Sequence, residues 1–422
     1  LKQIEELQPQ AIAINLLFSF MDGEDERRIA AVMPEEMFVA CSSAVLNEYC
    51  EYERGLATWL NAYVGPLMQR YLSQLAGLVR PASVSVLQSH GGVISAEQAG
   101  AHAVELLLSG PAGGLVGAQF QGNASGLDRL MSFDMGGTST DVALMDGEIR
   151  LTNGGEIAGY PIAVPMVDMH TIGAGGGSIA WRDEGGLLQV GPQSAGADPG
   201  PACYGRGGQQ ATVTDANLVL GRLPRAFALG EHLNLDFEAS WNAVGLLAEA
   251  MNLTVAATAA GIVQIADEHM AQALRVISVQ RGYDPQEFTL LSFGGAGGLH
   301  VCALAESLGM TRAMIPWQSG VLSALGMLVA SPARQLSHTR IQRLESAEVD
   351  TLKRDYQSMR DRLTQDMQVK EESELRFEES VELRYEGQSS TLNLPWKEDL
   401  SVLTQDFHTA HREQFGYLLG IS

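Results

Sequence analysis

The glycines of this chain gather in short clusters instead of spreading along it. Of 422 residues, 46 are glycine, about 11% against an average near 7%. Strand-like and helix-like segments separate the clusters, and glycine at such places lets a backbone turn tightly or approach another group closely. The pattern predicts an α/β chain punctuated by loops, not a low-complexity polymer. The clusters lie at 110–117, 136–137, 173–177, 185–208 and 294–298.

Composition and charge narrow the class of protein. The length allows two or three domains at about 150 residues each. Hydrophobic residues make up 45% of the chain and the mean hydropathy is +0.01, which is too apolar for a disordered chain. Lys and Arg total 27 against 50 Asp and Glu, so the net charge is −23. Bulk charge therefore argues against a nucleic-acid partner and favours a soluble enzyme with a local anion site.

Two further features bear on location. The longest uncharged apolar run, 11–20, is far shorter than the roughly 20 residues of a membrane span, so no membrane partner is expected. The chain begins Leu-Lys-Gln-Ile without an initiator Met or a signal-peptide pattern, and we interpret it as an internal piece of a longer protein. The cysteines form no CxxC pair, which is typical of reduced thiols and predicts a cytoplasmic location: Cys41, Cys50, Cys203 and Cys302.

Hydrophobic periodicity predicts the regular elements. A buried strand over 11–20 precedes a helix over 24–32. A helix over 48–75 is expected to break near Gly65-Pro66 and to bury its aromatic residues. The remaining predictions are strands over 84–89, 130–133, 141–145 and 288–293, a hairpin at Asp146-Gly147, and helices over 256–279 and 298–308.

One motif combines glycines, hydroxyls and two acids between two predicted strands: Asp134-Met-Gly-Gly-Thr-Ser-Thr-Asp141. Two glycines allow the backbone to approach an oxyanion, and two carboxylates can hold a hydrated Mg²⁺. The pattern is coherent for a nucleotide phosphate, and the alternative is a hairpin whose Asp and Thr side chains satisfy their own turn. The candidate phosphate-binding residues are Gly136, Gly137, Thr138, Ser139 and Thr140, and the candidate metal ligands are Asp134 and Asp141.

A second glycine loop joins a predicted strand to a predicted helix: Leu291-Ser-Phe-Gly-Gly-Ala-Gly-Gly-Leu-His300. Bare backbone at a helix start leaves room for a flat ring or a phosphate. The loop does not follow the GxGxxG dinucleotide pattern, and a close-packing turn is the alternative. The candidate ligand-binding residues are Gly294, Gly295, Gly297 and Gly298.

Three other segments carry weaker signals. The segment 109–118 is predicted to be a loop before an apolar helix, serving either packing or ligand binding. Asp168 and His170 share one face if extended, so they are candidates for a metal pair or an acid/base pair, although such a pair is more often structural. The Gly- and Pro-rich segment 191–205 is predicted to be an irregular functional loop, with Cys203 a buried thiol in preference to a nucleophile.

Together these segments resemble the hydantoinase A / 5-oxoprolinase family, whose members include nucleotide-binding subunits of acetone and acetophenone carboxylases. His90 departs from the family pattern, which usually has Asn there, so the hydrogen-bonding and pH response of that position differ. The resemblance spans nearly the whole chain and rests on Asn61-Ala-Tyr, Gln88-Ser-His-Gly-Gly, Leu108-Ser-Gly-Pro-Ala-Gly-Gly, Phe133 to Asp141, His170 to Ser178, 191–205, Thr214-Asp-Ala-Asn, Phe293-Gly-Gly-Ala-Gly-Gly and Leu383-Arg-Tyr-Glu-Gly-Gln.

The family is similar to the actin/Hsp70/sugar-kinase ATPases, which have ribonuclease H-like domains. On that analogy 134–141 is the second phosphate loop and Phe293 to Gly298 is the adenosine loop. The first phosphate loop of the family has no counterpart before Asp134 in this chain. The expected organisation is the remainder of the first lobe with connecting helices over 1–125, a second lobe over 126–338, and a small C-terminal α+β region over 339–422, where glycine becomes rare and charge rises.

The resemblance implies an ATP-dependent hydrolase subunit that phosphorylates a cyclic amide of the hydantoin, 5-oxoproline or lactam type. ATP and Mg²⁺ are the implied cofactors, and a hydantoinase B-type subunit is the implied partner. Asp134 and Asp141 would organise Mg²⁺ and the attacking group; Asp168, His170 and Asp215 are further candidates for substrate or metal contact. The alternatives are an ATP-dependent ketone carboxylase subunit and a non-catalytic nucleotide-binding scaffold, which the absent first phosphate loop favours.

Overall fold

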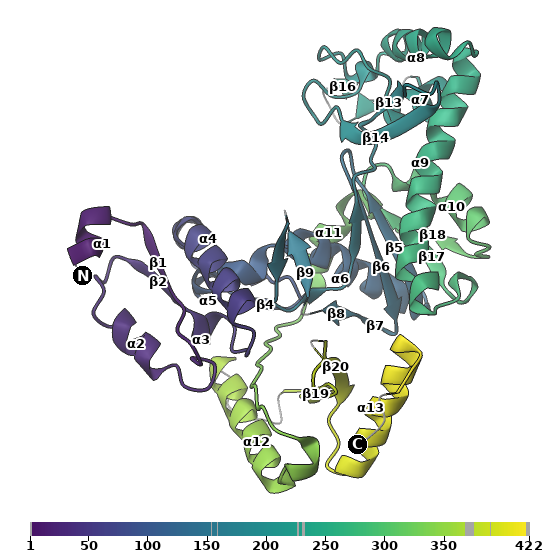
Figure 1. The fold of residues 1–422 in the computed structure, drawn as a ribbon. Helices are drawn as coiled ribbons and strands as arrows, with labels where there is room; N and C mark the ends of the chain where they lie inside the picture. The colour runs from purple at the N-terminus through teal and green to yellow at the C-terminus, as the bar shows by residue number, and fades with distance from the viewer. Residues whose placement is uncertain are drawn as a thin grey trace.

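The computed structural model describes residues 2–152, 154–157, 159–225, 228–229, 233–367, 375–388 and 390–418. Figure 1 shows a central sheet with helices on its faces, an N-terminal part to one side, and a C-terminal part below. Helices and strands alternate along the chain, which confirms the predicted α/β class.

The N-terminal part is organised by one long helix, α4 (Glu51–Leu78). Its neighbours include a short parallel strand pair, β1 with β2, and an antiparallel pair, β3 with β4. The elements are α1 (Lys2–Leu7), β1 (Ala11–Ile14), α2 (Glu24–Ala30), β2 (Phe38–Cys41), α3 (Ser42–Val45), β3 (Ser85–Leu87), β4 (Val93–Ser95), α5 (Ala96–Ala101) and η1 (Ala103–Leu106).

Helix α4 corrects two predictions. It runs without a break through Pro66, so the tertiary contacts of the helix outweigh the one hydrogen bond that Pro66 removes. Its buried face consists mainly of small residues, and a Cβ on Gly65 would lie 2.2 Å from the Phe38 ring. The aromatic residues predicted to be core, Trp59, Tyr63 and Tyr71, therefore lie on the opposite, exposed face. The strand predicted over 11–20 ends at Ile14.

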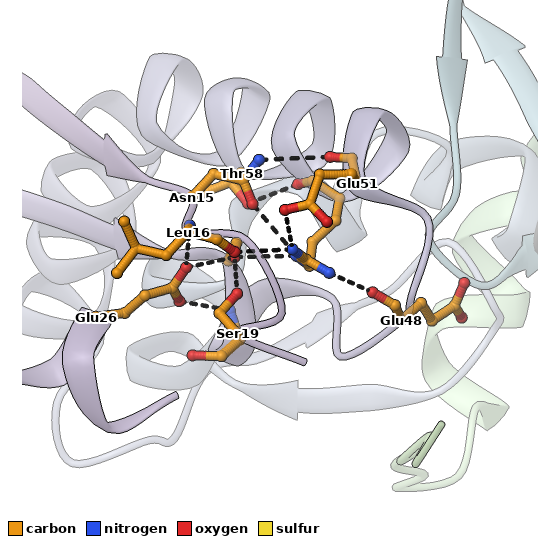
Figure 2. A network of polar contacts seen from close by, with 10 residues as sticks. Asn15, Leu16, Ser19, Glu26, Glu48, Glu51 and Thr58 are labelled. Atoms are coloured by element: carbon orange, nitrogen blue, oxygen red, sulfur yellow. Dashed lines mark hydrogen bonds and ion pairs between the residues drawn. The ribbon is translucent and has the colours of Figure 1, made fainter. Parts of the chain in front are cut away.

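A buried arginine connects α4 to the segment before it (Figure 2). The guanidinium of Arg54 donates to the carbonyl oxygens of Glu48 (2.7 Å) and Leu16 (3.0 Å) and to a carboxylate oxygen of Glu51 (2.7 Å). Its Nε also lies 3.2 Å from the hydroxyl of Ser42, which donates to the buried carboxylate of Glu26 at 2.6 Å. Burial alone would raise the pKa of Glu26, but hydrogen bonds from the side chain of Ser42 and from two backbone N–H groups hold it below its ordinary value.

The central sheet has the strand order β12-β6-β5-β17-β18, with β7 paired to β6. Strands β5, β17 and β18 are parallel, whereas β6 is antiparallel to β5 and β12. The Asp146-Gly147 hairpin between β6 and β7 is confirmed. The strand bounds are β5 (Arg129–Met135), β6 (Thr140–Asp146), β7 (Glu148–Ile149), β12 (His170–Ile172), β17 (Thr289–Phe293) and β18 (Ala313–Met314).

Alternation along the strands assigns side chains to two cores. Phe133 and Leu144 face the long helix α9 (Val255–Ile277), which runs alongside the sheet in Figure 1. Leu130 and Ala143 face α6 (Ser109–Ala124) on the opposite side. By the same alternation, Asp134 and Asp141 lie on the α6 face.

Helices α6 and α11 (Leu322–Val329) cross in backbone contact. A Cβ on Gly326 would lie 1.8 Å from the Gly113 carbonyl oxygen, and one on Gly117 would lie 2.5 Å from the Leu322 carbonyl oxygen. The predicted loop over 109–118 is therefore wrong: these residues already form the helix, because their glycines serve helix packing despite their low helix propensity.

A cap of small elements lies at one end of the sheet (Figure 1). Its strands β13 and β14 are antiparallel. Residues 191–194 belong to β14, so the predicted irregular loop begins only after Ser194; pairing with β13 outweighs the Gly-Pro sequence. The bounds are β13 (Ser178–Arg182), β14 (Leu188–Ser194), η2 (Ala202–Tyr204), α7 (Val213–Val219), β15 (Ala228–Leu229), β16 (Leu233–Asn234) and α8 (Phe237–Met251).

The C-terminal part places α13 against the β19–β20 hairpin, with Leu403 and Phe407 of the helix on Leu392 and Leu394 of the sheet. Its elements are η7 (Leu344–Ser346), α12 (Val349–Asp366), β19 (Ser380–Leu383), β20 (Leu392–Pro395) and α13 (Leu400–Phe415). The remaining short elements of the chain are β8 (Leu151–Thr152), β9 (Gly155–Ile157), β10 (Tyr160–Ile162), β11 (Met166–Val167), η3 (Val279–Arg281), η4 (Pro285–Glu287), η5 (Gly297–Leu299), α10 (Val301–Ser307) and η6 (Ser319–Val321).

In the part of the chain that the structure describes, no single helix is both long enough and apolar enough to span a membrane. One pair of helices, α8 with α9, meets the length and composition requirement only jointly and is bent by 93°.

Candidate functional site

Two carboxylates face each other at the end of the β5–β6 hairpin. Asp134 and Asp141 occupy directly opposite positions in the strand register. The turn between them is closed by the backbone N–H of Gly136, which donates to the Ser139 carbonyl oxygen at 3.0 Å. Opposite positions on one sheet face bring side chains to within about 5.5 Å at Cβ. The hairpin therefore holds two acids side by side.

The surroundings of this pair disfavour two negative charges. Burial, and then the nearby charge of Asp141, raise the pKa of Asp134 to about 6. Burial also raises the pKa of Asp141, partly offset by the hydroxyl of Thr171, which donates to it at 2.7 Å. No described residue donates a hydrogen bond to the Asp134 carboxylate. A cation between the two carboxylates would offset their repulsion and would give the Asp134 carboxylate a partner.

The turn itself offers hydrogen-bond donors. Gly137 and Thr138 are exposed, and among the described residues no group accepts from the backbone N–H of Gly137, Thr138 or Ser139. The hydroxyls of Thr138 and Ser139 are equally without a described partner. Thr140 differs, because it is buried and its hydroxyl donates to the Ala174 carbonyl oxygen at 2.5 Å. The donors that remain for an anion are thus those of 137–139.

A second glycine segment, 173–177, supports this turn from behind. The N–H groups of Gly176 and Gly177 donate to the carbonyl oxygens of Gly136 (3.0 Å) and Gly137 (2.6 Å). A Cβ on Gly175 would lie 2.7 Å from the Gly137 carbonyl carbon. Thr214 at the start of α7 then holds Gly176 by two hydrogen bonds of 2.8 Å, from its N–H and its hydroxyl. Glycine is required here for close backbone approach.

The loop after β17 adjoins the carboxylates. Gly294 has φ +80°, and a Cβ there would lie 2.1 Å from a carboxylate oxygen of Asp134. The N–H of Ala296 donates to the Met135 carbonyl oxygen at 3.0 Å. Gly295 has open space where a side chain would project. The structure thus brings the two predicted glycine loops together at one edge of the sheet.

A small hollow lies beside the carboxylate pair, between the strands β5, β6 and β17 and helix α6. The first turn of α6 borders it through Pro111, and no side chain caps that helix, so its N–H groups add positive potential at this place. The hollow is lined by Pro111, Leu115, Asp134, Asp141, Val142, Ala143, Met169 and Phe293.

Asp168 and His170 do not form a pair with each other. Asp168 is engaged by the guanidinium of Arg281, with one contact at 3.2 Å and a shorter one. His170 lies opposite Val142 in β12 and has no hydrogen-bond partner among the described residues. Within those residues there is no cluster of three or more His, Cys, Asp or Glu side chains suited to a metal ion. Met169, which lies between Asp168 and His170 in the sequence, lines the hollow.

Asp215 is a structural residue, which corrects its prediction as a ligand contact. It is fully buried in the capping box of α7. Its carboxylate accepts from the N–H groups of Ala202 (3.1 Å) and Cys203 (2.9 Å), from both the N–H and the hydroxyl of Thr212, and from the hydroxyl of Ser240 (2.6 Å). No acceptor position is left for a substrate. Cys203 is fully buried, and burial followed by Asp215 raises its pKa, which confirms an inert thiol.

No role was predicted for Thr171 or Thr214, yet both hold residues of the site in place. Thr171 is paired with Asp141 in the β6–β12 register. Only the pairing of β12 with β6 could have revealed this contact. For Thr214 the available signal was its place one residue inside a helix that starts with a capping box, which directs its N–H outward.

The sequence of this chain is similar to those of known proteins. Residues 54–336, two thirds of the chain, match the sequence profile described as Hydantoinase/oxoprolinase. The chain belongs to the hydantoinase/oxoprolinase family. One family relative is the caprolactamase subunit alpha of Pseudomonas jessenii, which is 34% identical over 433 residues. That match covers 98% of this chain but 62% of the relative, so the chain spans about three fifths of the relative's length.

Two solved structures share this hydantoinase/oxoprolinase fold. The crystal structure of the ATP-dependent caprolactamase from Pseudomonas jessenii superposes with a TM-score of 0.88 at 33% identity, covering 100% of this chain and 64% of that one. A nucleotide-free structure of acetone carboxylase, from work on ATP-dependent acetone carboxylation, gives a TM-score of 0.72 at 25% identity, covering 98% of this chain and 62% of that one.

Proposed function

We propose that this chain is the nucleotide-handling portion of an ATP-dependent hydrolase that opens a cyclic amide. In this reaction ATP transfers its terminal phosphoryl group to the amide oxygen and leaves as ADP. Water then adds to the activated carbon, the C–N bond of the ring breaks with the nitrogen taking up a proton, and hydrolysis of the resulting acyl phosphate releases phosphate. The observation that carries the proposal is the pair Asp134 and Asp141, placed opposite each other beside a turn with free N–H donors, in a chain whose fold follows the ATP-dependent caprolactamase over its whole length.

The chain's own residues supply positioning and charge. The N–H groups of Gly137, Thr138 and Ser139 would hold phosphate oxygens, and the glycines after β17 would leave room for the adenosine. Such a site lowers the barrier by fixing the reactants and neutralising developing charge, with little covalent chemistry from the protein.

Mg²⁺ suits the donor set. Asp134 lacks a hydrogen-bond donor among the described residues, its pKa is raised by burial and by Asp141, and both side chains offer hard oxygen ligands with room for water. These are the conditions that Mg²⁺ accepts, since it keeps several waters and takes one or two carboxylates. When bound, the ion would neutralise phosphate charge. Asp134 and Asp141 would hold it, and Thr171 would keep Asp141 oriented.

The relatives also suggest a partner and a class of substrate. The caprolactamase relative is named as a subunit, so we propose that this protein too works with a partner, of the hydantoinase B type, and on a lactam, hydantoin or 5-oxoproline. A ketone carboxylase is the second candidate, supported by the acetone carboxylase fold match. An actin-like two-lobed ATPase architecture and a cytoplasmic location belong to the same proposal.

Calorimetry of Mg²⁺ with ATP tests the nucleotide site directly. We expect binding by the wild-type chain and its loss in Asp141→Asn. The matched control is Asp128→Asn, an exposed carboxylate just before the opposite end of β5, which should bind like the wild type. Binding that is absent from the wild type, or equal in all three proteins, would contradict the proposed site.

The reaction class is tested on the full-length protein with its partner subunit. Release of ADP and phosphate on addition of a lactam, without any need for bicarbonate, is expected for the hydrolase. A strict bicarbonate requirement with a ketone would instead establish the carboxylase. Nucleotide binding without turnover on any cyclic amide or ketone would leave a scaffold as the function.

A further inference from the structure

A buried histidine lies directly after the glycine loop of β17. His300 is fully buried between η5 and α10. Its Nδ1 lies 2.5 Å from a carboxylate oxygen of Asp267 on α9, and its Nε2 lies 3.3 Å from the side-chain nitrogen of Asn217 on α7. Three elements distant in sequence therefore meet at one imidazole ring.

The contacts determine the protonation pattern of that ring. The side-chain nitrogen of Asn217 also donates to the Val213 carbonyl oxygen at 3.0 Å, which fixes the amide with its N–H groups toward His300. Nε2 of His300 must then accept, so the neutral ring carries its proton on Nδ1 and donates it to Asp267. Each atom of the ring that can form a hydrogen bond has one directional partner.

Helix α7 carries this connection to the other loop. Thr214, in the first turn of α7, donates twice to the Gly176 carbonyl oxygen, and Gly176 donates to the Gly136 carbonyl oxygen. Asn217 lies three residues further along the same helix. Asp215 anchors the helix between them with five accepted hydrogen bonds. Helix α7 is thus linked to the 136–140 turn through Gly176 at its N-terminal end and contacts His300 through Asn217.

We infer that Asp267, His300 and Asn217 form a buried connection that sets the spacing between the two glycine loops, so that His300 is a positioning residue for a nucleoside triphosphate that touches both. This inference rests on the proposed function for the identity of the ligand. The direct bond from Ala296 to Met135 joins the loops at their base, and the His300 connection fixes the far end of the second loop. Loss of the connection changes how well one ligand can reach both loops, without removing a group that contacts it.

Two conservative variants separate the two sides of the ring. The amide of Asn resembles Nδ1 of histidine in position, whereas the longer Gln places its amide near Nε2. His300→Asn should therefore keep the contact with Asp267 and lose that with Asn217, and His300→Gln should retain the link to α7. Asn217→Leu removes the link from the other side and leaves His300 in place.

The readout is a ratio that a general loss of stability would not change. Binding of ATP and of inorganic tripolyphosphate, each with Mg²⁺, is measured by calorimetry on the wild type and the three variants. We expect His300→Asn and Asn217→Leu to bind ATP about tenfold more weakly, the worth of one buried hydrogen bond, with tripolyphosphate binding unchanged and His300→Gln close to the wild type. Equal weakening of both ligands, or none, would overturn the inference.

Hydrogen exchange decides the same question without a ligand. We expect amides of 293–300 to exchange about tenfold faster in Asn217→Leu and His300→Asn than in the wild type, while the amides of the C-terminal α13 exchange as in the wild type. If the wild type binds neither phosphate ligand, the proposed function fails, while the exchange rates still test the connection. Unchanged exchange of 293–300 in both variants would refute the connection itself.

Discussion

Replacing Asp134 by Asn should stabilise the protein at neutral pH while abolishing the Mg²⁺ site that we propose. The pKa of Asp134 is raised from 3.8 to about 6, by burial first and by Asp141 second. Above pH 6 the folded protein must therefore hold a charge that its surroundings disfavour. A shift of about two pKa units corresponds to about 3 kcal/mol, and because the carboxylate is only partly buried, screening by water reduces this to about 2 kcal/mol.

The sign of the pH dependence follows from proton binding. Between the unfolded pKa of 3.8 and the folded pKa of about 6, the folded state binds more protons than the unfolded state, so the free energy of unfolding falls as the pH rises through this window. Asn carries no charge at any pH. The stability advantage of Asp134→Asn should thus be full at about pH 8 and should disappear by about pH 4.

Urea denaturation in the presence of EDTA measures the effect, with Asp128→Asn as the matched control. That carboxylate precedes the same strand and is exposed, so its replacement should leave the midpoint nearly unchanged at either pH. The reasoning is refuted if Asp134→Asn is no more stable than the wild type at pH 8, or if its advantage is the same at pH 4. Addition of Mg²⁺ should raise the midpoints of the wild type and of Asp128→Asn, but not that of Asp134→Asn.

Three further outcomes are expected. Arg54→Lys should lower the free energy of unfolding by about 3 kcal/mol in urea titrations, because an ammonium cannot match the five contacts of a buried guanidinium; stability equal to the wild type would contradict the network in Figure 2. Asp215→Asn should cost about 2 kcal/mol in thermal melts, since its NH₂ group would face donors, whereas a gain would show that the carboxylate is strained. A thiol reagent should label Cys302, which is exposed, in the native state and reach Cys203 only on unfolding; early labelling of Cys203 would show that the cap opens.

Local patterns in the sequence were sufficient where neighbouring residues decide the structure. The apolar segments 130–133 and 141–145 on either side of the glycines at 136–137 predicted two strands, and these strands form the hairpin that pairs Asp134 with Asp141. Local patterns failed where contacts with a segment distant in the sequence determine the role of a residue. Nothing near Asp215 in sequence indicates that Ser240 and the N–H groups of 202–203 occupy its carboxylate.

For helix α4 the sequence correctly predicted a helix but assigned the wrong face to the core. The spacing of Trp59, Tyr63 and Tyr71 is helical, but size and aromatic character pointed to the wrong face, because close packing on Phe38 requires small residues such as Gly65. The residues 109–118 have low helix propensity, and only the contact of Gly113 with Gly326 explains why a helix forms there. The roles of the candidate residues in binding remain predictions.

The crossing of α6 and α11 bears on how this part of the chain can be transferred between proteins. The chain enters the sheet region through α6 and leaves it through α11, and these helices touch at Gly113 and Gly326. The segment from Ser109 to Val329 therefore begins and ends beside one crossing, with the sheet, the cap and the candidate site between. A segment with adjoining ends can be inserted into another chain or circularly permuted at little cost. Gene fusion and exchange between relatives could thus move this segment as a single module.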